Sequence, residues 1–197
     1  SFFAIFNNDS VIEVLKRNIS TPEKIVDDII CAVSLTDLFG HTEYISGKPI
    51  NNYSEYVTFK FTKGENDNLD EKFKKLRQIV QASGCLPGMF PPAELDIHNH
   101  GSKKLYVDGG VTKNAPFGRA IKLDPELQFI FLVSTSPITK PILNEIKTFP
   151  SIVGQVYEIV VLKDIVNDYR KVVQINEKIK LLAKILEKTK KGKIVNN

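Results

Sequence analysis

Residues 105–121 read LYVDGGVTKNAPFGRAI: an apolar run ends in an acid, and two glycines and a proline-containing turn follow. An aspartate directly after a buried strand constrains the fold, because its carboxylate then lies at the rim of a sheet. Asp-Gly and Gly-Gly are common turn dipeptides, so a simple turn is one interpretation. The other is a catalytic carboxylate, since the chemistry of open α/β sheets takes place outside the carboxyl ends of the strands. Both interpretations apply to Asp108.

Three apolar runs predict strands. Near-continuous runs over 28–38 and 127–136 are typical of buried strands, the second of a central parallel strand. The run over 56–61 alternates between apolar and polar side chains, which indicates an antiparallel or edge strand. Strands that alternate with helical stretches favour an α/β fold. We therefore expect residues 1–197 to form a single three-layer α/β/α domain with a mostly parallel central sheet.

Helical stretches occupy the segments between and after these strands. A short amphipathic helix is expected from about Ser10, a second from an N-cap at Thr21 and a third from an N-cap at Asn68. The apolar spacing over 151–191 predicts a long helical region at the end of the chain.

Composition excludes several classes of protein. A chain with 42% apolar and 25% charged residues is ordinary for a soluble globular domain. Two cysteines, Cys31 and Cys85, are too few for a disulfide scaffold. Residues 180–193 hold six lysines and one glutamate, so the other 183 residues carry a net charge of −1. The protein has no basic body, which argues against nucleic-acid binding.

Two motifs in order carry a family resemblance. Residues 81–92 read QASGCLPGMFPP, and residues 106–116 read YVDGGVTKNAP. Together they resemble the patatin-like phospholipases, which pair an A-S-x-x-x-P-x-x-F-P-P loop with a downstream D-G-G-x-x-x-N-x-P box. Residues 31–46, 131–137 and 168–179 are similar to further parts of that family, so the resemblance covers nearly the whole chain.

The resemblance implies a lipid acyl-ester hydrolase of the phospholipase A or lysophospholipase type. A serine would attack the ester, and Asp108 would activate that serine without a histidine, a metal or an organic cofactor. Gly109 and Gly110 would leave the strand end open to close approach, a role that glycine fills without steric cost. The substrate would be a phospholipid or another acyl-ester lipid, and the expected location is cytoplasmic.

The resemblance also assigns roles around Asp108. Ser83 would be a structural hydrogen-bonding residue, and Pro87 would shape the loop beside the site. Asn114 would fix the turn after Asp108, with a direct substrate contact as the alternative. Cys85 and Ser83 are weaker candidates for the nucleophile, since no histidine is placed to activate either.

The match to the family breaks in the N-terminal third. The chain contains no G-x-S-x-G nucleophile motif and no glycine-rich oxyanion loop. We therefore expect an N-terminal portion of the family domain to be missing from this sequence, and the visible chain alone to be inactive. The alternative is a non-catalytic lipid-surface or protein-interaction domain derived from the same fold.

Two other features have competing interpretations. His98 and His100 suggest a metal site, but a polar surface loop explains them better, because a site needs three or four ligands at set distances. Lys180, Lys184 and Lys188 share one helical face. They belong either to a final helix docked on the core or to peripheral contact with an anionic membrane.

Overall fold

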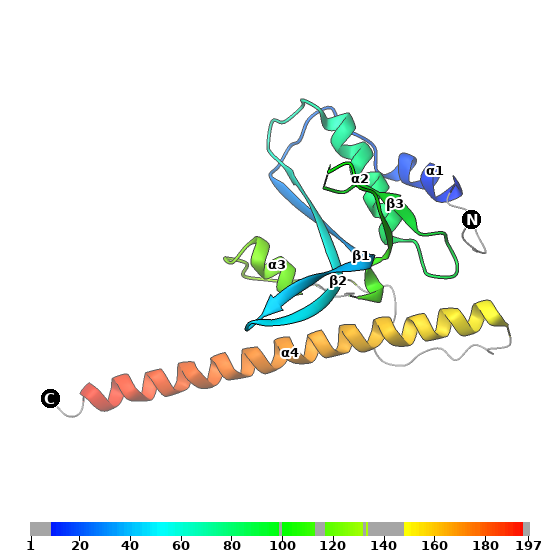
Figure 1. Ribbon diagram of the computed structural model, residues 1–197. Helices are drawn as coiled ribbons and strands as arrows, with labels where there is room; N and C mark the ends of the chain where they lie inside the picture. Colours follow the sequence, from blue (N-terminus) through cyan, green and yellow to red (C-terminus); the bar gives the residue numbers. More distant parts are fainter. Residues whose placement is uncertain (1–8, 99, 113–116, 132, 134–147, 195–197) are drawn as a thin grey trace.

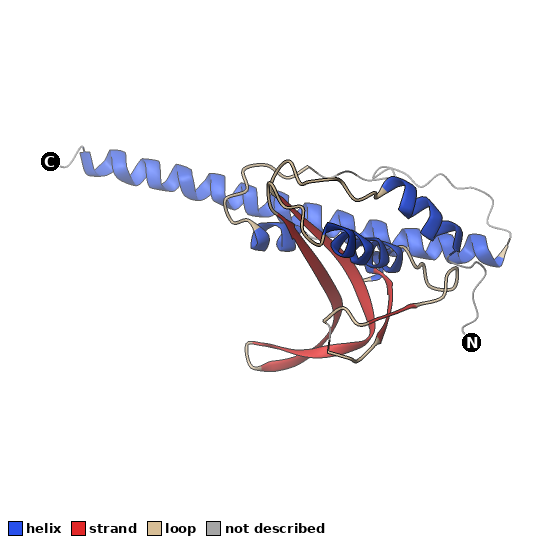
Figure 2. Ribbon diagram, turned by 90° about the horizontal axis from the view of Figure 1, so that it is seen from above, coloured by secondary structure: helices blue, strands red, loops and turns tan. Residues whose placement is uncertain are grey.

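The sheet of this protein is antiparallel throughout. The computed structural model describes residues 9–98, 100–112, 117–131, 133 and 148–194 of the chain. Within them, a sheet of four strands has the order β2-β1-β4-β3, and every neighbouring pair is antiparallel (Figure 2). The strands are β1 (Ile29–Ile45), β2 (Lys48–Phe61), β3 (Ala93–Leu95) and β4 (Lys104–Asp108). The expectation of a mostly parallel central sheet was wrong.

A tight hairpin is the physical reason for this difference. The predicted strands 28–38 and 56–61 are the two arms of one long ribbon, β1 and β2, joined at Ser46 and Gly47. Both residues have positive φ, 52° and 78°, as a two-residue hairpin turn requires. A parallel pair would need a long crossover connection, usually a helix, between these strands.

The strand predicted over 127–136 was also wrong where the structure describes it. Residues 127–131 and 133 adopt no regular structure, and the side chains of Phe129, Phe131 and Val133 are exposed. An apolar run becomes a central strand only when another strand pairs with it on each edge. In the four-stranded sheet, no strand pairs with residues 127–131 or 133. The remaining residues of the run lie outside the described part of the chain.

The N-terminal helix was predicted correctly, but the one expected at Thr21 is absent. Helix α1 spans Asp9–Asn18, and the chain then runs irregularly to β1. Ile25 explains the loop. Its side chain is buried, its N–H donates to the Glu65 carbonyl and its carbonyl accepts from the Gly64 N–H. Backbone groups bonded to a distant loop are not available for helical hydrogen bonds.

The core lies between the sheet and helix α2 (Leu69–Ser83). Leu76 and Ile79 of α2 pack with Leu35, Phe59 and Tyr106 of the sheet in one buried cluster. The start of α2 differs from the prediction in detail. Asn68 has a left-handed backbone with φ of 57° and makes no side-chain cap, so burial of Leu69 and the residues after it positions the helix.

Within the described residues, three helical elements follow β4. They are the 3₁₀ turn η1 (Gly109–Val111), the short helix α3 (Phe117–Leu123) and the 46-residue helix α4 (Phe149–Ile194). Thr148 directly precedes α4. Its N–H donates to Ser151 Oγ at 3.0 Å, and the Ser151 N–H donates back to Thr148 Oγ1 at 3.4 Å. The predicted helical region is thus confirmed as one continuous helix, whose second half extends beyond the rest of the molecule (Figure 1).

Candidate active site around Asp108

The backbone of Asp108 is held from two sides. Its N–H donates to the carbonyl of Cys85 in the loop after α2, at 3.0 Å. Its own carbonyl accepts a hydrogen bond of 2.8 Å from Thr36 Oγ1 on β1. Thr36 is buried, and its hydroxyl also lies 3.0 Å from that of Thr112. The end of β4 is therefore fixed to the proline-containing loop and to the neighbouring strand.

The carboxyl group of Asp108 accepts hydrogen bonds of its own. Oδ1 accepts from the Gly110 N–H at 2.6 Å, so Asp108 caps the 3₁₀ turn that follows it. Burial raises the pKa of Asp108 above its ordinary value, while the hydrogen bonds from Gly110 and from the Tyr157 hydroxyl oppose that rise. A carboxylate with a raised pKa is a stronger base, which suits proton abstraction. The turn interpretation and the carboxylate interpretation are thus compatible.

Gly109 has a packing role. A Cβ added there would overlap the backbone carbonyl and the side-chain hydroxyl of Ser34 on β1. The close approach expected at this glycine is made by another segment of the same chain. Gly110 is likewise buried and uses its N–H to hold the Asp108 carboxyl.

The proline loop is a short structured turn. Ser83 is the half-buried last residue of α2, and the N–H of Met89 then donates to the Leu86 carbonyl at 3.0 Å. Pro87 and Gly88, with φ of 81° at Gly88, occupy the two central positions of this turn, as in a type II turn. Pro87 thus shapes the loop that binds the Asp108 N–H. Asn114 lies outside the described residues.

Helix α4 covers both motifs. It contacts η1, and the Cβ position of Gly88 in the proline loop lies 4.0 Å from Val153 Cγ1. Tyr157 lies one helical turn further on, and its hydroxyl acts to lower the pKa of Asp108. Sequence reasoning missed Tyr157, as it missed Thr36, because neither belongs to a recognisable spacing around Asp108.

Comparison with known proteins agrees with this pairing of motifs. A family model described as patatin-like phospholipase matches residues 6–121, which is more than half of the chain and includes both motifs. The chain belongs to the patatin-like phospholipase family. Searches of curated proteins and of solved structures gave no match. In this patatin-like chain the family match ends before α4 begins.

The family supports a lipid hydrolase. The sequence also offered Cys85 as a nucleophile and His98 and His100 as metal ligands, and their surroundings differ from those of the Asp108 carboxyl. Cys85 is buried, and its Sγ lies 3.3 Å from the Gln81 carbonyl, so it is not open to a substrate. The rings of His98 and His100 stack with centroids 5.8 Å apart, and His98 Nε2 lies 3.6 Å from a Glu55 oxygen. Across the described ranges, no three or more His, Cys, Asp or Glu side chains are grouped to hold a metal ion.

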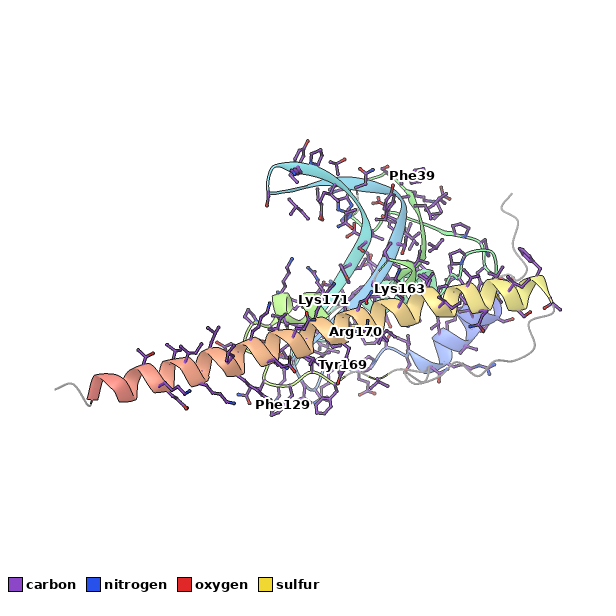
Figure 3. The ribbon with its side chains drawn as sticks, turned by 90° about the horizontal axis from the view of Figure 1, so that it is seen from below. Phe39, Phe129, Lys163, Tyr169, Arg170 and Lys171 are labelled. Atoms are coloured by element: carbon purple, nitrogen blue, oxygen red, sulfur yellow. The ribbon has the colours of Figure 1, made fainter. Side chains whose placement is uncertain are left out.

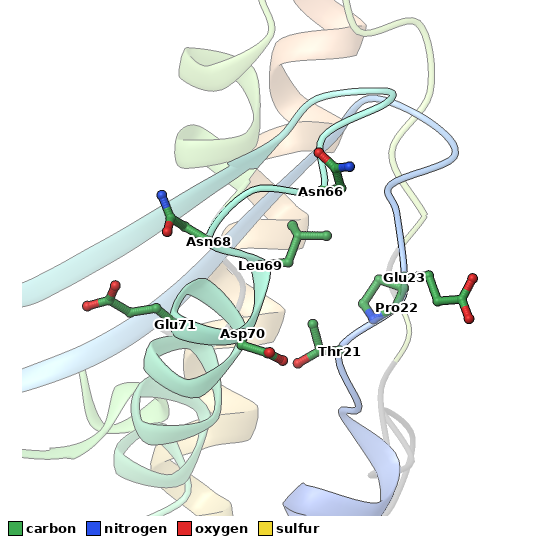
Figure 4. Close-up of a pocket in the computed structure, with 8 residues that line it drawn as sticks. All are labelled: Thr21, Pro22, Glu23, Asn66, Asn68, Leu69, Asp70 and Glu71. Atoms are coloured by element: carbon green, nitrogen blue, oxygen red, sulfur yellow. The ribbon is translucent and has the colours of Figure 1, made fainter.

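Two cavities lined by described residues lie away from the two motifs. One of about 530 Å³ lies between the loop before β1 and the start of α2, where Thr21 and Asp70 point toward one another (Figure 4). Another, of about 490 Å³, lies between the hairpin and α3 and includes His41 and Arg119. Neither of these two cavities is lined by Asp108.

Much of the second half of α4 is exposed. Residues 174–189 all have exposed side chains, and they stand away from the body of the molecule (Figure 3). Of the two interpretations of the final helix, docking on the core does not describe residues 174–189. Among described residues, no helix combines the length and apolar character needed to cross a membrane.

Proposed function

We propose that the protein acts on lipid acyl esters, with Asp108 as the general base of a Ser–Asp dyad. The observation that carries this proposal is the environment of the Asp108 carboxyl. It is partly buried, its pKa is raised by burial, and it ends a strand that both family motifs hold in place.

In the proposed reaction, the carboxylate takes the hydroxyl proton of a serine as the serine oxygen attacks the acyl carbonyl carbon. The proton then passes to the departing alcohol, and water later hydrolyses the acyl-serine. General-base assistance of this kind is worth about 10²–10⁴-fold in rate. The serine requires a G-x-S-x-G elbow, which the 197 residues do not contain, so we expect these residues by themselves not to hydrolyse esters.

Fluorophosphonate labelling tests this proposal. The probe is added to the protein expressed from its natural gene, and any adduct is counted by intact mass. We expect one adduct, and Asp108→Asn should slow labelling and ester hydrolysis by at least about 10²-fold. Asp70→Asn, a change at an exposed carboxylate on α2, serves as the matched control and should leave both rates unchanged. No adduct in the unmodified protein would favour a non-catalytic interaction domain instead.

A second role, peripheral contact with a lipid surface, is favoured by the exposed half of α4. Its apolar side chains recur at intervals of four, three and four residues, at Ile175, Ile179, Leu182 and Leu186. The three lysines at 180, 184 and 188 lie on a different face. An exposed apolar stripe with nearby lysines is typical of helices that lie in the interface of an anionic membrane.

Vesicle sedimentation tests this second role. We expect binding to vesicles with anionic lipid, little binding to purely phosphatidylcholine vesicles, and a decrease in binding with added salt. Replacing Lys180, Lys184 and Lys188 together by Ala should remove up to about 1 kcal/mol per lysine. Binding that is independent of salt and of these lysines would contradict the proposal.

A further inference from the structure

The ribbon of β1 and β2 and the short helix α3 form the two walls of a groove. One face of the ribbon buries Phe59 in the core, and the opposite face carries Ala32, Tyr56 and Thr58. Helix α3 lies beside this opposite face, where Arg119 Nη2 donates a hydrogen bond of 2.9 Å to Thr58 Oγ1 (Figure 1). The groove therefore lies on the side of the ribbon that does not enter the core.

Two cavities in this groove share Arg119 and Tyr56. The first, of about 490 Å³, is otherwise lined mainly by polar side chains of the hairpin and by Lys122. The second, of about 470 Å³, is lined mainly by apolar residues, namely Ile30, Ala32, Ala120, Leu123 and Leu127. Each volume is in the range of small-molecule sites, roughly 300–1,000 Å³. The groove is thus polar at one end and apolar at the other, with Arg119 between them.

The guanidinium of Arg119 is held in place without a carboxylate. Besides the bond to Thr58, its Cζ lies 5.5 Å from the centre of the Tyr56 ring. Among the described residues, its buried Nε has no hydrogen-bond partner and no carboxylate is ion-paired with it. Buried N–H groups in native proteins are almost always hydrogen-bonded, so Arg119 retains the capacity to bind an anion.

Four carboxylates also line the groove, and each has a hydrogen-bond partner. Glu43 Oε1 lies 3.2 Å from a histidine ring nitrogen, and Glu55 accepts a bond of 3.1 Å from a backbone N–H. Asp28 and Asp124 accept from backbone N–H groups at 2.6 Å and 3.0 Å. Both aspartates are exposed, so solvent and salt screen their charge. The charge at the junction of the two cavities is therefore set by Arg119.

An amphiphile with one negative charge matches this layout. A carboxylate fits the planar fork of a guanidinium, and charge-assisted hydrogen bonds of this kind are about twice as strong as neutral ones. A hydrocarbon chain gains free energy when it leaves water for an apolar surface. Inorganic anions lack the chain, and neutral lipids lack the charge.

We infer that this groove binds a long-chain fatty acid, with its carboxylate on Arg119 and its chain against Ile30, Leu123 and Leu127. The inference goes beyond the proposed hydrolysis, because binding requires neither a nucleophilic serine nor the Asp108 carboxyl. Asp108 lines neither cavity.

Isothermal titration of oleate, below the concentration at which it forms micelles, tests the inference on the protein expressed from its natural gene. We expect one saturable site per chain. Arg119→Gln removes the charged donor and should weaken oleate binding about 10- to 100-fold. Arg17→Gln, at an exposed arginine of α1, is the matched control and should leave the Kd unchanged. Thermal unfolding of both variants checks that the fold is kept.

Two control ligands separate the head group from the chain without any change to the protein, and they decide the matter if Arg119→Gln does not fold. Oleyl alcohol keeps the chain and lacks the charge, so it should bind at least about 10-fold more weakly than oleate. Acetate lacks the chain and should not bind measurably. Equal affinities for oleate and oleyl alcohol, an unchanged Kd in folded Arg119→Gln, or no saturable binding of oleate would each overturn the inference. The proposed hydrolysis fails independently, through the absence of a fluorophosphonate adduct.

Discussion

The two halves of α4 are similar in sequence and different in environment. Residues 149–173 and residues 174–189 both place aliphatic side chains at helical spacing. In the first half, Val153 lies against the proline loop, the helix contacts η1, and Ile165 is buried. In the second half, every side chain is exposed, and Leu182 keeps 59% of its surface in contact with solvent. An apolar stripe thus specifies a helix, while the surface opposite it decides whether that stripe is buried.

The largest expected effect on stability is at η1, on which the first half of α4 packs. Gly109→Ala would place a methyl group on the Ser34 backbone, which cannot give way as a flexible side chain can. We expect a loss of about 3 kcal/mol or more in the free energy of unfolding, measured by urea denaturation. Gly154→Ala on α4 is the matched control, because nothing lies within 4 Å of its Cβ position and helix propensity predicts a gain of about 1 kcal/mol. Equal stabilities for the two variants would contradict the packing described here.

A pair of truncations tests the two halves directly. Ile165→Ala should lower the free energy of unfolding by about 2–4 kcal/mol, since it leaves a cavity at a site with 4% exposure. Leu182→Ala should change it by less than about 0.5 kcal/mol. Both values come from the same denaturation experiment. A large loss for Leu182→Ala would show that the second half is covered in solution.

The pH dependence of stability tests the burial of Asp108, which lies beside η1 and the packed first half of α4. Its folded-state pKa is raised, so its contribution to stability is fully present below the unfolded pKa and is lost as the pH rises through the folded pKa. Asp108→Asn should therefore be more stable than the parent at pH 7 and unfold at a higher temperature. The difference should shrink as the pH falls below 4, and a constant difference from pH 3 to pH 8 would rule out this explanation.

The smallest effect on stability is expected from removing the second half. A chain that ends after Val173 should unfold at nearly the same denaturant concentration as the full chain, within about 0.5 kcal/mol, because residues 174–189 bury no side chain. The same chain should lose binding to anionic vesicles. If the shortened protein kept full vesicle binding, the proposed lipid contact would have to be moved to another surface.

Sequence reasoning located the elements better than their arrangement. The runs at 28–38 and 56–61 do form strands, and α1, α2 and α4 are helices where the spacing predicted them. The direction of the strands was missed, because the Ser46–Gly47 turn was not recognised as a hairpin between them. Apolar patterns report which face is covered, but strand direction depends on the connection.

The candidate site shows the same limit. Two short motifs predicted that the proline loop and Asp108 act together, and the bond between the Asp108 N–H and the Cys85 carbonyl joins them. Thr36 and Tyr157 were not predicted. The Thr36 hydroxyl donates to the Asp108 carbonyl from β1, and Tyr157 on α4 affects the Asp108 pKa. Contacts between distant segments leave no spacing pattern in a single sequence.

The continuity of α4 also has a mechanical consequence. An unbroken helix turns as one body, so a torque applied to its exposed end is transmitted to the residues that touch the motifs. With side chains that reach about 5–6 Å from the axis, a roll of about 20° displaces their tips by roughly 2 Å. That distance exceeds the tolerance of a hydrogen bond. A partner that binds residues 174–189 and turns the helix would therefore also move the residues of α4 that contact η1 and the proline loop.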